Sequence, residues 1–413
     1  MKTNALVTSY PGAPFTLTPL RLDPDPRPDE VHVRIHATGI CHTDLKFSRE
    51  TSMASNFPCV FGHEGAGTVQ RVGSEVSSRG RVKVGDRVIC VFSCCGTCKY
   101  CLRQETGYCD TWFQLNFGRG RGDGSCAFSL IDHENSNSNG NGNGNDTNSN
   151  SSKTTSASSS RKNPASQRVT SHFFGQSSFA HDIYVKETGI VVVPDPSIPF
   201  SLLAPLACGI MTGAGAMLNI LQPTPTMNIC VVGTGSVGLA AIMALNILDP
   251  ALRPKRVIAV DIVPARLELA RSAGATHGVN ARWRRRGLMQ TLMEITDGEG
   301  VHGSIDLTGD GKVVQELVHA CARRGTVVTV GTGGVAGEVT LNLFEMVQAG
   351  CRYVGCQQGE CYPQEFLPML LQAYQEGKFP YDRLVKTYPV AAVQDAIDDM
   401  EAGETVKPVL IWD

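Results

Sequence analysis

The sequence lacks an excess of charge of either sign, and it lacks any long hydrophobic run. Its 37 lysines and arginines stand against 39 aspartates and glutamates, which leaves a formal net charge of −2. Such a chain has no broad basic field to attract nucleic acid or anionic lipid, so we expect neither as a partner. Without an apolar stretch of about 18 residues we expect no membrane span. The start of the chain also lacks the apolar core of a signal peptide, which favours the cytosol.

The chain has 413 residues, which exceeds one average domain and suits two domains with separate cores. It contains fifteen cysteines, a high and odd number. In a long cytosolic chain, clustered cysteines indicate bound metal or reactive thiols before they indicate disulfides. Their spacing has to decide between these uses.

The first third of the chain is expected to be mainly β. Apolar and polar residues roughly alternate over 31–35 and 65–72, with glycines between the runs. Residues 134–168 are dominated by Asn, Ser, Gly and Thr, a composition too polar to form a core, so we predict a disordered surface loop. A neutral, deletable insertion is favoured over a functional tether. Strand-like patterning resumes afterwards, so the insertion interrupts the β domain and does not separate two domains.

From residue 227 onward the pattern becomes a βαβα alternation. Strands are predicted over 228–235 and 256–262, helices over 236–248 and 264–275, and the alternation continues with a helix over 312–324 and a strand over 325–331. This order predicts a parallel sheet covered by helices on both faces, the doubly wound or Rossmann arrangement.

A GxGxxG motif, formed by Gly233, Gly235 and Gly238, follows the first of these strands and opens the next helix. The three glycines permit a tight turn, a close backbone approach to a pyrophosphate, and close helix–strand packing. Asp261 ends the second strand, where its carboxylate would bind the adenosine ribose and repel a 2′-phosphate, so NAD is favoured over NADP. Arg266, one turn further, is a candidate for the adenosine end, although a solvated helix face explains it equally well.

A cysteine cluster follows the pattern C-x2-C-x2-C-x7-C and consists of Cys95, Cys98, Cys101 and Cys109. Four thiolates fill a tetrahedral coordination sphere, so this is predicted to be a structural zinc site that performs no chemistry. An iron–sulfur cluster is the main alternative. The adjacent Cys94 has no assigned role.

Two further segments, GICHTDL and FGHEGAG, combine thiol, imidazole and carboxylate groups. Together with the cysteine cluster and VVGTGSVG, in this order, they resemble the zinc-containing medium-chain alcohol dehydrogenases. The resemblance covers nearly the whole chain except the insertion, and APLACGIMTGAGAMLN is especially similar to the aryl (benzyl) alcohol dehydrogenase branch. It implies a mainly β (GroES-like) catalytic domain at 1–207, an NAD-binding Rossmann domain at 208–345, and a return to the catalytic domain at 346–413.

The resemblance also assigns site residues. Cys41, His63 and Cys208 would bind a catalytic zinc, and a second zinc would occupy the cysteine cluster. Asp44 and Glu64 would lie behind the zinc ligands, and Asp44 would orient an imidazole through its free ring nitrogen. His42 and Lys407 would lie near the cofactor phosphates, and Thr212 near the nicotinamide. Zinc would polarise the alcohol oxygen while hydride passes to the nicotinamide ring.

Thr43 would take the alcohol proton and pass it outward through the nicotinamide ribose. Many family members end this relay in a histidine, and the corresponding residue here is Lys46. An ordinary amine, with a pKa of about 10.4, accepts protons poorly at neutral pH, so a relay through water or through a tuned lysine stays open.

The aryl-like segment favours an aromatic, allylic or heterocyclic primary alcohol or its aldehyde. Since long polar insertions are common in fungal proteins, a role in fungal secondary metabolism is one hypothesis. General ethanol-type or formaldehyde-type dehydrogenases, and a non-catalytic NAD and zinc redox sensor, are the alternatives. The family implies a homodimer or homotetramer, with a preference for the dimer.

Overall fold

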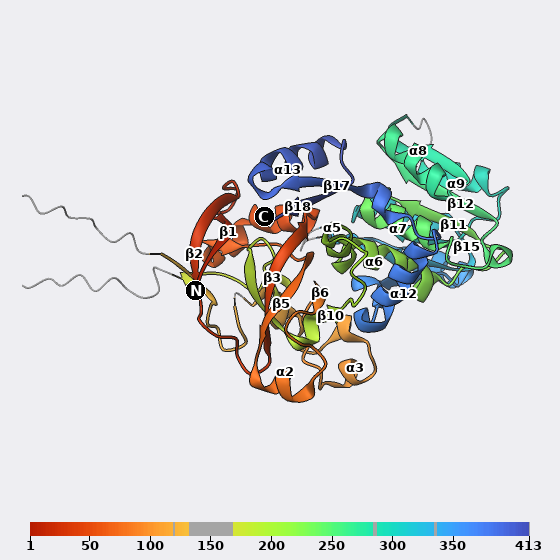
Figure 1. The fold of residues 1–413 in the computed structure, drawn as a ribbon. Coiled ribbons are helices and arrows are strands. Elements are labelled where there is room, and N and C mark those ends of the chain that lie inside the picture. Colours follow the sequence, from red (N-terminus) through yellow and green to blue (C-terminus); the bar gives the residue numbers. More distant parts are fainter. Residues whose placement is uncertain (119, 132–167, 284–286, 334–336, 413) are drawn as a thin grey trace, which may run out of the picture.

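The computed structural model describes residues 1–118, 120–131, 168–283, 287–333 and 337–412 (Figure 1). The domain that carries both termini is built on two mainly antiparallel sheets. The smaller sheet has the order β4 (Cys59–Val60), β1 (Lys2–Thr8), β2 (Thr16–Leu22), β7 (Phe128–Leu130), β8 (Arg168–Val169). The larger sheet has the order β10 (Ile190–Val192), β6 (Arg87–Cys90), β5 (Gly65–Val72), β3 (Glu30–Gly39), β18 (Lys407–Ile411), β17 (Val385–Pro389), with β9 (Asp182–Lys186) also on β3. Both predicted strands, at 31–35 and 65–72, are confirmed.

The polar insertion leaves and re-enters this domain at one place. β7 and β8 pair antiparallel, with Phe128 opposite Val169 and Ser129 opposite Arg168. The two flanks are therefore neighbouring strands of the same sheet, as expected from the patterning on either side. The insertion itself lies almost entirely in 132–167, outside the described residues, so its predicted disorder stays a prediction.

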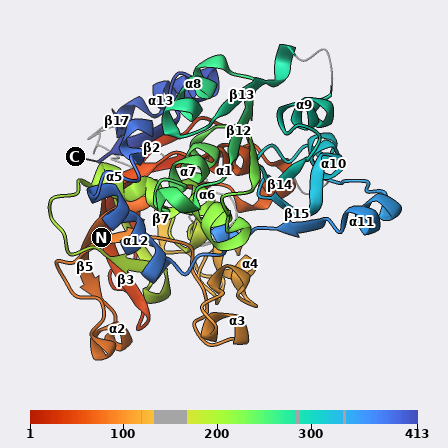
Figure 2. The same cartoon turned by 90° about the vertical axis from the view of Figure 1, so that its right-hand side faces the viewer.

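The second domain is a six-stranded parallel sheet, in keeping with the predicted Rossmann arrangement. Its order is β13 (His277–Asn280), β12 (Arg256–Asp261), β11 (Asn228–Val232), β14 (Val301–Asp306), β15 (Cys321–Thr329), β16 (Arg352–Gly355). Alternate residues of β11 enter different cores, because Ile229 and Val231 pack with one buried cluster and Cys230 and Val232 with another. Two faces of one sheet are thus buried. The covering helices are α7 (Ser236–Ala244) and α8 (Pro264–Ala273) on one face, α9 (Leu288–Ile295) and α10 (Gly311–His319) on the other (Figure 2).

Two boundaries differ from the sequence-based expectation. The helix expected over 312–324 ends at His319. Cys321 already belongs to β15, where it pairs with Val301 of β14, and the Val301 N–H donates to the carbonyl oxygen of Ala320. The expected return to the first domain at 346 falls inside α11 (Leu343–Ala349), and β16 still pairs with β15 of the parallel sheet. The chain rejoins the first domain's large sheet only with β17 and β18.

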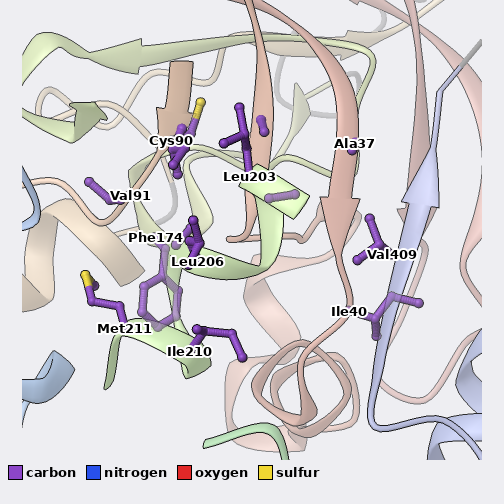
Figure 3. Packing of buried hydrophobic residues seen from close by; sticks show 14 of the residues in the cluster. Ala37, Ile40, Cys90, Val91, Phe174, Leu203, Leu206, Ile210, Met211 and Val409 are labelled. Atoms are coloured by element: carbon purple, nitrogen blue, oxygen red, sulfur yellow. The ribbon is translucent and has the colours of Figure 1, made fainter. Parts of the chain in front are cut away.

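Short helices connect the two domains through a shared apolar core. α5 (Phe200–Leu203), the 3-10 turn Ala204–Ala207 and α6 (Gly209–Gly215) contribute to the same buried cluster as strands β3 and β18 (Figure 3). Their residues in it include Leu203, Leu206, Ile210 and Met211. Among the described residues, no single helix is long and apolar enough to cross a membrane. Within the described part of the chain, one helix pair passes this test by length and composition, Phe200–Ala207 with Gly209–Leu221, and it is bent by 57°.

Candidate functional site

Four potential metal ligands converge between the domains. The donor atoms of Cys41, His63, Glu64 and Cys208 all lie within 4.8 Å of one another. They come from three places: Cys41 caps α1 (His42–Ser48), His63 and Glu64 lie just before β5, and Cys208 precedes α6. His63 Nε2 is 3.2 Å from the Cys208 Sγ. Thiolate and imidazole are the donors that zinc prefers, so this set fits a zinc ion.

Asp44 fixes two of the ligand-bearing loops to each other. Its fully buried carboxylate accepts hydrogen bonds from the backbone N–H groups of Cys41 and Gly62, both at 3.0 Å. It also accepts one from His63 Nδ1 at 2.9 Å. A histidine that donates through Nδ1 presents Nε2 to a metal, which is the orienting role expected for Asp44. Burial disfavours the charged imidazole, yet the Asp44 carboxylate holds the pKa of His63 well above its usual range.

The thiols and carboxylates of this cluster influence one another strongly. The hydrogen bond between Cys208 and Cys41 holds the pKa of Cys41 well below the ordinary thiol value and raises that of Cys208 well above it. Burial raises the pKa of Glu64 to about 7, although Lys407 opposes the shift. Lys407 Nζ lies 2.8 and 3.0 Å from the two Glu64 oxygens and donates to the carbonyl of Ile40 at 3.1 Å.

Lys407 therefore differs from the position expected for a phosphate-binding cation. Its side chain is only 1% exposed, and its ammonium group already contacts three oxygen atoms beside the metal ligands. Because Glu64 has no exposure, a buried carboxylate at this place needs a buried cation nearby. No local sequence pattern indicates this pairing, because the two residues are 343 positions apart.

The residues of the expected proton relay lie along α1. Cys41 Sγ contacts Thr43 Oγ1 at 3.6 Å, so the hydroxyl lies beside the metal ligands. Lys46 is exposed and donates from Nζ to Thr332 Oγ1 of the parallel-sheet domain at 3.2 Å. Lys46 thus links the two domains through one hydrogen bond. Burial lowers the pKa of His42, as do the positive charges of Lys407 and Arg266.

Aromatic rings cover one side of the ligand cluster, a feature that sequence reasoning missed. Phe174 stacks on the His63 imidazole with 4.4 Å between centroids and 21° between planes, and Phe173 meets it edge-on at 5.7 Å. Phe117 of α4 (Trp112–Phe117) lies 5.7 Å from Phe173 and 5.0 Å from Phe174. The tract HFFG carried the only sequence signal, an aromatic pair in a strand-like stretch. Figure 3 shows Phe174 among core residues of the interdomain segment.

The glycine motif has the geometry that a dinucleotide site requires. Gly233 has a φ of +93°, a conformation that favours glycine, at the turn after β11. A Cβ at Gly238 would lie 2.0 Å from the Gly233 carbonyl oxygen, so helix α7 packs directly on the turn. A Cβ at Gly235 would meet nothing within 4 Å, which leaves its backbone open to a ligand at the N-terminus of α7.

The remaining expected cofactor residues lie on three elements, β12, α8 and α6. Asp261 ends β12, and its carboxylate accepts hydrogen bonds from Thr234 N at 2.6 Å and Thr234 Oγ1 at 2.8 Å. It thereby ties the glycine turn to the second strand. Arg266 lies on α8 with its Nε buried and without a hydrogen-bond partner in the described structure. Thr212 lies on α6, one turn after Cys208.

The cysteine lobe forms a second cluster. Its donor atoms lie within 4.8 Å of one another and belong to Cys95, Cys98, Cys101 and Cys109. The backbone N–H groups of Thr97 and Cys98 donate to Cys95 Sγ at 3.5 and 3.3 Å. Burial works against the Cys95 thiolate, but these donors lower its pKa to about 6. Cys94 is buried beside the lobe and lies outside the set of four. A closed set of four thiols fits a structural zinc.

Comparisons with known proteins agree with the observed fold. The alcohol dehydrogenase GroES-like domain matches residues 27–135, and the zinc-binding dehydrogenase domain matches 236–375. A geraniol dehydrogenase of Castellaniella defragrans is 32% identical over 99% of this chain and 97% of its own. The crystal structure of benzyl alcohol dehydrogenase from Acinetobacter calcoaceticus aligns with a TM-score of 0.83 and 32% identity, covering 100% of both chains. An alcohol dehydrogenase zinc-binding domain protein from Burkholderia ambifaria aligns with a TM-score of 0.85 and 35% identity, covering 100% of this chain and 99% of its own. The chain belongs to the zinc-containing medium-chain alcohol dehydrogenase family.

Proposed function

We propose that the chain is an NAD-linked dehydrogenase for primary alcohols whose carbinol carbon bears an aromatic or allylic group, and that it also reduces the corresponding aldehydes. The observation that carries this proposal is the aromatic wall beside the metal ligands, with Phe173 and Phe174 against His63. Aromatic rings favour planar unsaturated groups through edge-on and offset contacts. The names of two relatives support it, since benzyl alcohol is aromatic and geraniol is allylic.

The proposed mechanism divides the work among residues already placed. Cys41, His63 and Cys208 would hold the catalytic zinc, with Asp44 fixing the imidazole. When bound, zinc supplies a Lewis acid for the alcohol oxygen, and nicotinamide accepts the hydride. Thr43, whose hydroxyl lies 3.6 Å from Cys41 Sγ, would accept the alcohol proton as it passes on its own proton. Because Lys46 is exposed, the proton would leave from there to solvent water.

We infer two zinc ions per chain and a preference for NAD. The second ion belongs to the closed lobe of four cysteines, where no ligand position is left for substrate. The cofactor preference rests on the Asp261 carboxylate at the end of β12, since a 2′-phosphate beside it would meet a like charge.

The variant Phe174→Ala tests the substrate class. We expect kcat/KM for benzyl-type and allylic alcohols to fall about tenfold while that for ethanol changes little, because only the unsaturated substrates lose a ring contact. Steady-state rates at the nicotinamide absorbance band measure this ratio. Phe113→Ala is the matched control, because Phe113 lies on α4 beside Phe117 of the aromatic wall but is 72% exposed. Equal losses for all substrates would show that Phe174 only supports His63, and would remove the basis of the proposal.

The runner-up functions predict different results in the same assay. An ethanol-type enzyme would turn over short aliphatic alcohols best, and a formaldehyde-type enzyme would require glutathione. A redox sensor would bind zinc and NAD without turning over any alcohol. The role in fungal secondary metabolism stays a prediction, because no described residue bears on it.

We also propose that two copies associate through the outer edge of the parallel sheet. β16 is the last strand of that sheet, and the adjacent α11 exposes Leu343, Phe344 and Val347 at 80%, 71% and 77% (Figure 2). An unpaired strand edge next to an apolar helix face is typical of a protein–protein contact.

Replacing Leu343, Phe344 and Val347 together by serine should convert a dimer to a monomer, because the apolar area that association buries is lost. Light scattering coupled to size exclusion measures the mass. A triple serine variant on the polar exposed face of α13 (Val393–Ala402), at Gln394, Asp395 and Asp398, serves as the control. A wild-type chain that is monomeric, or a tetramer unaffected by the change, would contradict this interface.

A further inference from the structure

The turn at 358–360 has an unusual backbone. Three consecutive residues adopt positive φ, with Gln358 at 53°, Gly359 at 71° and Glu360 at 51°. Only glycine adopts this region readily, so two of the three residues are strained there. Such strain persists only where surrounding contacts enforce it, and it occurs often at ligand sites.

One set of contacts comes from the helix that follows the catalytic cysteine. A Cβ at Gly359 would lie 2.9 Å from the Thr212 carbonyl oxygen, and one at Gly215 would lie 2.3 Å from the Gly359 carbonyl oxygen, so turn and α6 are in direct contact. Thr212 Oγ1 and Gln358 Oε1 are 3.5 Å apart. Asn219, on the π-helical turn Ala216–Leu221, donates to the carbonyl oxygens of Gly359 at 3.0 Å and Glu360 at 3.3 Å.

The other set comes from the cysteine lobe. Tyr108, next to Cys109, donates its hydroxyl hydrogen to Glu360 Oε1 at 3.0 Å, and the Tyr108 hydroxyl oxygen accepts a hydrogen bond from the Gln357 N–H at 3.4 Å. A Cβ at Gly107 would lie 3.1 Å from the Gln357 carbonyl oxygen, so the backbones also approach closely. The lobe thus contacts the strained turn through a second set of residues, separate from those of α6.

We propose that Tyr108 is a positioning residue through which the structural zinc lobe holds the 358–360 turn against α6, and that this contact sets the affinity for the nicotinamide half of the cofactor. The inference rests on the proposed placement of the nicotinamide beside Thr212. It gives the second metal site a task beyond local folding. With the lobe in place, the turn and α6 form one rigid wall that begins at Cys208. Without the Tyr108 hydroxyl, the two non-glycine residues relax toward ordinary backbone conformations and the wall loosens.

The test compares NADH affinity in four variants of the full-length, zinc-loaded protein. Tyr108→Phe and Glu360→Leu each remove the hydrogen bond, Glu360→Gln keeps an acceptor oxygen, and Glu365→Ala removes a different lobe-to-domain bond, the one from Gln104 to α12 (Pro363–Gln375). We expect the NADH dissociation constant to rise about tenfold in the first two variants and to stay near the wild-type value in the others. The double variant Tyr108→Phe/Glu360→Leu should bind NADH no more weakly than either single variant, because both changes remove the same hydrogen bond. Zinc content, measured by elemental analysis, should stay unchanged.

Wild-type affinity in Tyr108→Phe, or an equal loss in Glu365→Ala, would overturn the inference. If Tyr108→Phe loses zinc, the NADH affinity of Glu360→Leu becomes the deciding measurement, because that substitution leaves the cysteine lobe untouched. An unchanged NADH affinity in Glu360→Leu overturns the inference. A wild-type chain that binds no NADH would instead overturn the proposed function itself, so the two failures are distinguishable.

Discussion

Cys208→Ser should keep its fold and its affinity for NADH while kcat/KM falls by more than about a hundredfold. Loss of an outer partner of a metal ligand costs about 10–100-fold, and Cys208 is itself one of the converging donors, 3.2 Å from His63 Nε2. A serine hydroxyl is a poorer ligand than a thiolate, so a catalytic zinc would bind weakly or with the wrong geometry. Turnover, zinc content and NADH fluorescence, measured on one preparation, separate these effects.

Cys94→Ser is the matched control. Cys94 is also a buried cysteine near a metal cluster, but it lies outside both donor sets, so turnover should be close to that of the wild type. Unchanged turnover in Cys208→Ser would disprove the assignment of three protein ligands. Loss of NADH binding together with turnover would show that the substitution disturbs α6 and does not act through the metal alone.

The parts of the site that the sequence predicts are those encoded over short distances. The cysteine lobe needs only its own spacing, and the glycine motif needs only a strand before it and a helix after it. Asp44 is three residues from Cys41, so their hydrogen bond belongs to one helix N-terminus. The family resemblance then supplies His63 and Cys208, which no local pattern would connect.

The parts that were missed depend on tertiary packing. Lys407 was expected at the cofactor phosphates, and its pairing with Glu64 is visible only once β18 lies beside β3. Phe174 stacks on His63 because two loops of the first domain meet, and an aromatic pair in a β-rich stretch has many equivalent uses. The strained turn at 358–360 carries two non-glycine residues, which favour ordinary backbone conformations, so composition gives no warning of it.

Glu30 and Arg121 form another buried pair that no local sequence pattern predicts, because the two residues are 91 positions apart. Breaking this pair is expected to lower the stability of the protein strongly. The Arg121 guanidinium donates to both Glu30 oxygens, from Nε at 2.7 Å and from Nη2 at 2.9 Å. Both residues are buried, with Glu30 3% and Arg121 7% exposed. Charge attraction offsets the cost of burying both ions, and this balance fails if one partner is removed. The pair fastens the segment before β7 to the first residue of β3.

Arg121→Met should lower the free energy of unfolding by about 3–5 kcal/mol, because it leaves the Glu30 carboxylate buried without its partner. Burial alone would raise the pKa of Glu30, but the His172 imidazole 3.8 Å away, the hydrogen bonds from Arg121 and the bond from the Arg27 backbone N–H lower it from 4.5 to about 2. In the wild type this contribution is therefore complete above pH 4.5 and is lost as the pH falls through about 2. In the variant the deficit should shrink on acidification, because a protonated Glu30 is no longer a buried charge. Denaturant midpoints measured from neutral to acidic pH test both statements. The double variant Arg121→Met/Glu30→Leu should recover much of the loss, since it removes both charges. A single variant as stable as the wild type at neutral pH would show that solvent reaches this carboxylate.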